Sequence, residues 1–321
     1  MTVALLFSPQ GSQAVGMGRA LAAVSPAAAA VFAEADDALG WSVSSLAWNG
    51  PEEELNDTRQ TQPCLVATSI ACLRALEAEL DGRGERLSPA FVAGHSVGEY
   101  AALVAAGALS VADAVRLVAR RGELMADCGV GGGMVAVIGL DREVVASVVA
   151  SLGLGDDLVV ANDNAPGQVV ISGTPGALAA AAEPLRAAGA RRSIPINVSG
   201  PFHSPHMAGI GSELARALAT ADWHGAEPPV VSNVTAQPVR DSGEMRDLLA
   251  RQVDSPVEWV RSVRRMAAEG VDTFVECGPG NALTGMVRRI VPAAHTLNVF
   301  DPASLAASAD ALAEAAAGVP A

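Results

Sequence analysis

The segment Phe91-Val92-Ala93-Gly94-His95-Ser96-Val97-Gly98-Glu99 joins an apolar run to a stretch that favours a helix. The run predicts a buried strand, and the Gly-x-Ser-x-Gly after it predicts a tight turn into a helix. Side chains two residues either side of the serine would collide in such a turn, which explains both glycines. The helix N-terminus and the amide of Val97 offer positive potential where an oxyanion would form. The pattern predicts a nucleophilic Ser96.

Working outward, the flanking sequence predicts a large layered domain. Residues Val3 to Phe7 are wholly apolar and open into Ser-Pro-Gln-Gly, which is typical of a buried parallel strand. Further strands are expected at 89–94, 230–233 and 273–276. Helices are expected at 16–23, 26–38, 61–80, 98–106, 111–125, 204–218, 243–252, 256–269, 283–290 and 303–316. Residues 1–129 and 199–321 are therefore expected to form a large α/β-hydrolase-like subdomain with a parallel sheet.

A glycine-rich run over 129–133 interrupts this pattern and is interpreted as a hinge. After it come an expected strand at 134–139, a helix at 141–151, strands at 158–162 and 168–172, a helix at 175–188 and a strand at 191–196. The order βαββαβ is that of a ferredoxin-like unit. Residues 130–198 are therefore expected to form a small inserted subdomain.

Composition limits the classes of function. Half of the 321 residues are hydrophobic, so a sizeable core is expected, and the formal charge of −14 without a basic stripe argues against nucleic-acid binding. No window holds about 18 apolar residues without a charge or breaker, so no membrane span is expected. The four cysteines (Cys64, Cys72, Cys128, Cys277) are scattered and are expected to be reduced. A cytoplasmic protein is predicted.

A serine nucleophile needs a base, and the chain has five histidines. His95 adjoins Ser96, but neighbouring side chains on such a turn point apart, so local packing is expected for it. His224 and His295 lie in polar stretches and are expected to be solvated. His203, in a loop between the small subdomain and a helix, is favoured as the base, with His206 as the alternative.

Several segments together resemble the malonyl-CoA:acyl carrier protein transacylases and the acyltransferase domains of polyketide synthases. They occur in the family's order and span nearly the whole chain. The matching segments are Gln10-Gly11-Ser12-Gln13, Gly94-His95-Ser96-Val97-Gly98-Glu99-Tyr100, Arg120-Arg121-Gly122-Glu123-Leu124-Met125, the stretch 162–173, Phe202-His203-Ser204 and Glu276-Cys277-Gly278-Pro279-Gly280.

The resemblance implies roles for individual residues. Ser96 would be the nucleophile and His203 the general base, with the backbone carbonyl of Gln252 orienting the histidine in place of a triad carboxylate. The amides of Gln10 and Val97 would form the oxyanion hole.

Arg121 matches the arginine that pairs with the free carboxylate of a malonyl-type group. Its place beside Arg120 would otherwise indicate a surface residue, but a guanidinium is the apt bidentate partner for a carboxylate. Phe202 and Val97 resemble malonyl-selective members, because a bulky Phe202 would fill the space that an α-methyl group needs.

The chain departs from the family at two loops. The family's first loop usually reads Phe-Pro-Gly-Gln-Gly, whereas this chain has Phe7-Ser8-Pro9-Gln10-Gly11, and Pro9 fixes φ near −65°. Pro201 also replaces the residue that the family often carries there. The first departure leaves open whether the Gln10 amide points at the oxyanion.

The resemblance implies ping-pong transfer of a malonyl group from malonyl-CoA to the phosphopantetheine thiol of an acyl carrier protein, by a monomer that uses no metal or redox cofactor. Arg191 and Arg192 are the first candidates for carrier docking, with Arg288-Arg289 and Arg264-Arg265 as alternatives. Three other functions stay open at this point: a hydrolase that releases stalled acyl groups, a transferase for another acyl group, and a non-catalytic docking subunit.

Overall fold

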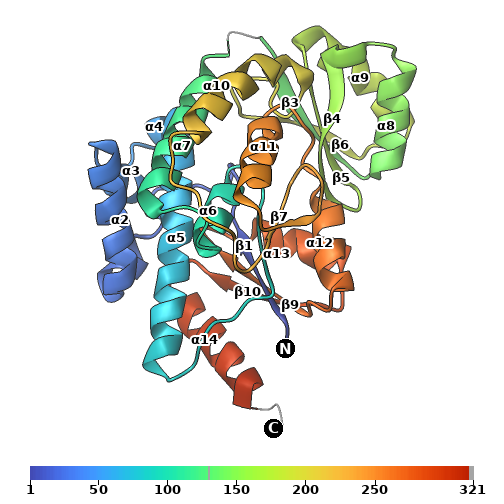
Figure 1. Ribbon diagram of the computed structural model, residues 1–321. Coiled ribbons are helices and arrows are strands. Elements are labelled where there is room, and N and C mark those ends of the chain that lie inside the picture. Colours follow the sequence, from blue (N-terminus) through green and yellow to red (C-terminus); the bar gives the residue numbers. More distant parts are fainter. Residues whose placement is uncertain (129–130, 318–321) are drawn as a thin grey trace.

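The computed structural model describes residues 1–128 and 131–317, which build two β-sheets with helices around them (Figure 1). The larger sheet has the strand order β10-β9-β1-β2-β7-β8. Every neighbouring pair in it is parallel except the β7–β8 hairpin. Its strands are β1 (Val3–Phe7), β2 (Phe91–Gly94), β7 (Val230–Val231), β8 (Pro238–Val239), β9 (Thr273–Cys277) and β10 (His295–Val299).

The central strands are apolar on both faces because helices cover both sides of the sheet. Leu5 and Phe7 of β1 belong to the larger core cluster, whereas Ala4 and Leu6 belong to a second cluster. This alternation follows from the two-residue period of a strand. Helices α12 (Trp259–Ala268) and α13 (Ala282–Ile290) supply the second cluster. The other helices of this domain are α1 (Arg19–Val24), α2 (Pro26–Leu39), α3 (Val43–Asn49), α4 (Glu52–Leu55), α5 (Thr58–Gly82), α6 (Gly98–Ala105), α7 (Val111–Ala126), α10 (Ala208–Leu218), α11 (Ser242–Gln252) and α14 (Pro302–Ala317).

The smaller sheet is antiparallel, has the order β4-β5-β3-β6, and packs α8 and α9 over its own core cluster (Figure 1). Its elements follow each other as βαββαβ, the order of a ferredoxin-like unit. Together with the parallel sheet this confirms the predicted fold class. The elements are β3 (Gly133–Ile138), α8 (Arg142–Ser151), β4 (Leu158–Ala165), β5 (Gln168–Gly173), α9 (Pro175–Ala187) and β6 (Arg192–Ile196).

Several short elements differ from the sequence-based expectations. Helices α3 and α4 and strands β8 and β10 were not predicted, and β7 ends at Val231 rather than at residue 233. Strand β10 is an edge strand whose residues are mostly part-exposed, so it lacks the apolar run that marks the buried strands. Residues 129–130 lie outside the described residues. The predicted hinge begins there, and the predicted boundary between the subdomains falls there.

Cys64, Cys72 and Cys277 are buried free thiols. In the part of the chain that the structure describes, no helix combines the length and the apolar character needed to cross a membrane.

The carboxyl ends of the parallel strands meet at the edge of the large sheet that carries the loops of interest. Strand β1 runs into the loop that starts at Ser8, β2 into the Ser96 turn, and β7 into a turn that contains Asn233. Parallel α/β sheets bind ligands at this edge. The small sheet is tied to the large domain by the backbone bond from Asp163 to Val257 and by the Arg142–Glu258 ion pair at 2.6 Å.

The two glycines around Ser96 are required by close backbone packing. A Cβ atom on Gly94 would lie 1.9 Å from the carbonyl carbon of Gly98, and a Cβ on Gly98 would lie 2.2 Å from the carbonyl oxygen of Phe7. Ser96 itself has a φ of 52°, in the left-handed region that costs most residues energy. The packing between β1, β2 and α6 therefore holds the serine in a conformation that it would not adopt alone.

We expect Gly98→Ala to lower the free energy of unfolding by about 1–3 kcal/mol, because its methyl group would press on backbone that cannot rotate away. Gly82→Ala is the matched control, since a Cβ atom there meets nothing within 4 Å. Urea unfolding of both variants tests this. Equal stability of Gly98→Ala and the unsubstituted protein would contradict the packing argument.

Candidate active site

A cleft of about 240 Å³ lies where the loops of the large sheet face the small sheet. The large domain contributes Gln10, Ser96, Arg121 and His203 to its lining. The small sheet contributes the apolar residues Met134, Val170 and Ile196 together with Asn162 and Asn164. The cleft thus places the predicted polar residues opposite a wall of mixed apolar and amide side chains.

Ser96 and His203 form a hydrogen-bonded pair within this cleft. The Oγ atom of Ser96 lies 2.8 Å from Nε2 of His203. The Nδ1 atom of His203 lies 2.9 Å from the carbonyl oxygen of Gln252 and 3.2 Å from that of Ser255. Since carbonyl oxygens only accept, Nδ1 carries the proton, and the Nε2 lone pair faces the serine hydroxyl. The predicted backbone orientation of the histidine is present, with Ser255 as a second acceptor.

The surroundings of His203 keep its ring neutral. Burial, and next the positive charge of Arg121, lower the pKa of His203 to about 3. Its backbone is held at a φ of 57°, and its N–H donates to the carbonyl of Val253 at 3.0 Å. The imidazole is thus a neutral acceptor at neutral pH, which is the state a general base requires.

Arg121 lies beside this pair with its guanidinium buried; the residue is 1% exposed. Nη1 donates to Oε1 of Gln62 at 2.8 Å, and Nη2 donates to Ser96 Oγ at 3.1 Å and to Oε1 of Gln252 at 3.0 Å. All these partners are neutral, and among the described residues no carboxylate forms an ion pair with Arg121. A buried charge of this kind is costly until an anion joins it.

Two backbone amides at the cleft are free to bind an oxyanion. In the described part of the chain, the N–H groups of Gln10 and Val97 donate to no protein acceptor. The amide of Ser96 is engaged, because it donates to Oδ1 of Asn233 at 2.6 Å. Val97 stands at the start of α6, where the helix dipole adds positive potential. These two amides are therefore available in the role that the sequence predicted.

The loop that carries Gln10 is held from two directions. Ser8 donates through Oγ to Oε1 of the buried Glu276 at 3.3 Å. Gly278, at a φ of 136°, packs so closely that a Cβ atom would lie 2.5 Å from Ser8 Oγ. The side chain of Gln10 donates to Thr58 Oγ1 at 3.1 Å. These contacts fix the loop in which Pro9 replaces the family's glycine.

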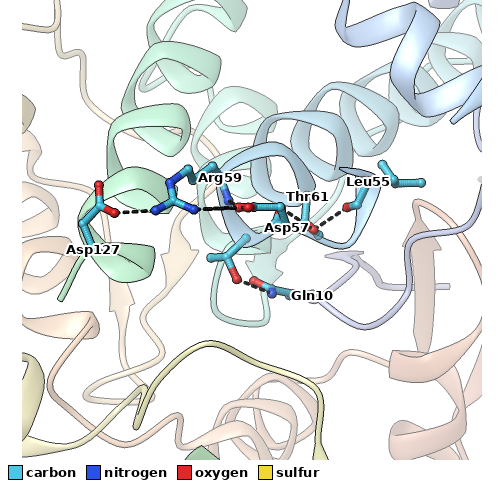
Figure 2. Close-up of polar contacts among 7 residues, drawn as sticks. Gln10, Leu55, Asp57, Arg59, Thr61 and Asp127 are labelled. Atoms are coloured by element: carbon cyan, nitrogen blue, oxygen red, sulfur yellow. Dashed lines mark hydrogen bonds and ion pairs between the residues drawn. The ribbon is translucent and has the colours of Figure 1, made fainter. Parts of the chain in front are cut away.

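Figure 2 shows how the start of α5 holds this side of the cleft. The Gln10 side chain points to the first turn of the helix, where Thr61 donates to the carbonyl of Leu55 at 2.5 Å. Arg59 joins Asp57, at 3.1 Å, to Asp127 at the end of α7. Since α5 carries Gln62 and α7 carries Arg121, this link ties together the two helices that position the guanidinium.

The two residues predicted to select the acyl group differ in their placement. Phe202 is buried and lines the cleft directly before His203. The side chain of Val97 is fully buried in the larger core cluster and is not part of the cleft lining. Val97 therefore offers its amide to the site, whereas the structure does not bring its side chain to the acyl group. The turn directs that side chain inward because α6 begins there.

Three residues of the site were missed by sequence reasoning. Gln62 and Glu99 lie on helices, where a single polar residue in an apolar pattern carries no distinct signal. Asn233 bridges the turn, accepting from the Ser96 amide and donating through Nδ2 to the Gly94 carbonyl at 2.6 Å. Its position after β7 at the same sheet edge as Ser96 was the signal that could have found it.

The other histidines lie as their sequence contexts predicted. Nε2 of His95 lies 2.8 Å from Oδ1 of Asn164, and burial lowers the pKa of His95 to about 4. His206 pairs with Asp157 at 3.2 Å and does not line the cleft. His224 and His295 are exposed. Among the five, only His203 has an imidazole that hydrogen-bonds to the Ser96 hydroxyl.

Comparison with known proteins identifies the family. The model of the acyl transferase domain matches residues 4–305. The chain is 42% identical to the malonyl CoA-acyl carrier protein transacylase of Bacillus subtilis over 94% of its own length and 95% of the relative's. It is 42% identical to the Escherichia coli K12 enzyme of the same name, over 95% and 98%.

Solved structures agree with this assignment. An acyl carrier protein S-malonyltransferase from Vibrio cholerae superposes with a TM-score of 0.91 at 40% identity, covering 96% of this chain and 100% of that one. A malonyl-transacylase solved in complex with a type II polyketide synthase acyl carrier protein gives 0.91 at 39%, covering 97% and 100%. The resemblance predicted from the motifs is confirmed: the chain belongs to the acyl transferase family, among its malonyl CoA-acyl carrier protein transacylases.

Proposed function

We propose that the protein transfers a malonyl group from malonyl-CoA to the phosphopantetheine thiol of an acyl carrier protein, through an ester on Ser96. The curated relatives carry the name of this activity. The observation that carries the proposal for this chain is the buried guanidinium of Arg121, which forms no ion pair with a described residue and donates to the serine oxygen at 3.1 Å. It is placed to receive a carboxylate on the acyl group that Ser96 attacks.

The first step forms the malonyl ester. Ser96 Oγ attacks the thioester carbonyl carbon while its proton passes to Nε2 of His203, 2.8 Å away. The free amides of Gln10 and Val97 donate hydrogen bonds to the carbonyl oxygen and stabilise the negative charge that develops on it. The carbon–sulfur bond then breaks, and the CoA sulfur leaves with the proton from His203.

The second step reverses this chemistry with a different thiol. The phosphopantetheine thiol of the carrier gives its proton to His203 and attacks the ester carbonyl carbon. The bond to Ser96 Oγ breaks, and the serine takes the proton back. Because one thioester is exchanged for another, no change of oxidation state occurs, and the proposal includes neither a metal nor a redox cofactor.

Selection for malonyl over acetyl follows from the charge of Arg121. A malonyl carboxylate would pair with the buried guanidinium, whereas an acetyl group would leave it unpaired, a difference of several kcal/mol in transition-state binding. Phe202, buried in the cleft wall beside His203, supports selection against an α-methyl substituent. The two interactions act on different parts of the acyl group.

The arrangement favours this transfer over the rival functions. A hydrolase of simple acyl chains gains nothing from an unpaired buried guanidinium, and a non-catalytic docking subunit does not need a hydrogen-bonded Ser96–His203 pair. A transferase for another acyl group would have to carry an anion at the same distance from its carbonyl. The cytoplasmic location and the monomeric state stay predictions.

We also propose that Arg191 and Arg192 contribute to carrier docking. Both are exposed beside or on the edge strand β6, and neither forms an ion pair with a described residue. Of the alternatives, Arg265 pairs with Glu269 at 2.7 Å, whereas Arg288 and Arg289 donate to the neutral side chains of Thr296 and Gln168. Arg192 begins strand β6 and Ile196, which lines the cleft, ends it, so a carrier held at Arg191 and Arg192 would lie about 13 Å along the strand from the cleft.

Incubation with malonyl-CoA followed by intact-mass spectrometry tests the proposed function. We expect one malonyl adduct, mapped by peptide digestion to Ser96, and its disappearance when the holo form of a carrier protein is added. Ser96→Ala should give no adduct, because the nucleophile is absent. An adduct of equal yield on Ser96→Ala, or rapid release of free malonate without a carrier, would refute the transferase mechanism.

Charge reversal tests the docking surface. We expect Arg191→Glu combined with Arg192→Glu to slow transfer to the carrier about tenfold at low salt, while self-acylation by malonyl-CoA changes less than about twofold. The Arg264→Glu/Arg265→Glu double variant is the matched control and should keep both rates. If the control pair alone slows transfer, docking lies at that surface instead.

A further inference from the structure

Glu99 is a buried carboxyl group directly behind the nucleophile turn. It lies in the first turn of α6, is 5% exposed, and does not line the cleft. It therefore touches neither substrate nor the reacting atoms. Both of its hydrogen bonds end on the same oxygen, Oε2, which accepts from Nε2 of Gln252 at 2.6 Å and from the backbone N–H of Asn233 at 3.2 Å.

Two acceptors orient the Gln252 amide, because its Nε2 donates to Oε2 of Glu99 at 2.6 Å and to the backbone carbonyl of Ser96 at 3.1 Å. The carbonyl end Oε1 of Gln252 therefore turns to Arg121, whose Nη2 donates to it at 3.0 Å. With the amide reversed, its NH₂ group would face the guanidinium, and two donors would meet. Glu99 accepts the shorter of the two bonds and so helps to fix the acceptor that holds the carboxylate-binding arginine.

The second bond reaches the serine turn through Asn233. The Asn233 side chain accepts from the Ser96 amide and donates to the Gly94 carbonyl, both at 2.6 Å. It spans the turn in which Ser96 is held at a φ of 52°. Because the Asn233 backbone N–H donates to Glu99, a displaced carboxyl would release the residue that fixes the nucleophile.

We propose that Glu99 is a positioning residue that sets the relative placement of Ser96 and Arg121, through Asn233 and Gln252. The inference rests on the proposed function, in which Arg121 receives the malonyl carboxylate. The role is assigned to the oxygen that both donors reach; the charge of Glu99 also interacts with Arg121, and the Glu99→Gln variant separates the two effects.

A glutamine can therefore replace it. Burial raises the pKa of Glu99 to about 7, and a proton on Oε1 leaves both bonds to Oε2 intact. The side-chain carbonyl of glutamine offers an acceptor of the same geometry without the titration.

Kinetics with malonyl-CoA and acetyl-CoA, each measured as kcat and KM, test the proposal. We expect Glu99→Ala to lower kcat/KM for malonyl-CoA about 100-fold and to lower the malonyl-to-acetyl ratio about tenfold, since an unfixed Arg121 selects less well. Glu99→Gln should stay within about threefold of the unsubstituted protein in both quantities. A purely structural role would reduce the amount of folded enzyme but leave the ratio unchanged.

Two further variants complete the design. Glu99→Leu fills a similar volume without an acceptor and gives the same readout if Glu99→Ala yields little folded protein. Glu77→Ala removes a part-buried carboxyl on α5, whose ion pair with Arg74 at 2.6 Å lies outside the cleft, and should keep the ratio.

The outcomes distinguish a failure of the proposed function from a failure of the proposed role of Glu99. If the unsubstituted protein does not prefer malonyl-CoA, the proposed function fails, whatever Glu99 does. If it does prefer malonyl-CoA and the acceptor-free variants keep that preference, the role of Glu99 is refuted. Equal losses in Glu99→Gln and Glu99→Ala would also refute it, because they would show that the charge matters rather than the acceptor.

Discussion

The buried guanidinium of Arg121 is the interaction on which the rest of the site depends. An arginine side chain in this position gives up its hydration, and burial lowers its pKa accordingly. Among the described residues, its hydrogen-bond acceptors are all neutral, namely the side-chain oxygens of Gln62, Gln252 and Ser96. The fold therefore holds a positive charge without an ion-pair partner next to a nucleophile, and a carboxylate on the acyl group is the partner that completes it.

This charge also explains the form of the catalytic pair. A triad carboxylate beside His203 would lie close to Arg121 and could neutralise it in place of the substrate. The histidine is oriented instead by the carbonyls of Gln252 and Ser255, which fix its tautomer without adding a negative charge. The same positive charge helps to lower the pKa of His203 and keeps the base unprotonated. Substrate recognition and the orientation of the base therefore both depend on the positive charge of Arg121.

The fold supplies this arrangement from the ends of its parallel strands. Gly98 packs against the backbone of Phe7, so α6 and the first loop, which carry the two free amides, are fixed relative to each other. Much of this was predictable from the sequence. The strand, the serine turn and its glycines follow from residues 91–99, and the βαββαβ order follows from spacing. From the residues alone His203 was only favoured over His206, and Arg121 resembled a surface arginine; the family motifs supplied its role and that of Gln252.

What the sequence did not reveal depends on contacts between distant segments. Gln62 meets Arg121 across 59 residues, and Asn233 meets Ser96 across 137. A polar residue on a helix gives no local sign that it faces a buried partner, so Gln62 could not be distinguished from a surface residue, and the partners of Glu99 stayed hidden although it lies in the serine motif. The inward direction of the Val97 side chain was missed for a related reason, since it is set by the packing of α6 rather than by the turn sequence.

The most direct test of the central claim is the ratio of kcat/KM for malonyl-CoA to that for acetyl-CoA in Arg121→Ala. Arg120→Ala is the matched control, because its side chain is exposed and pairs with Glu123 at 3.0 Å. If the unpaired guanidinium selects the acyl group, the ratio should fall about 100-fold or more in Arg121→Ala and stay unchanged in Arg120→Ala. An unchanged ratio in Arg121→Ala would contradict the account.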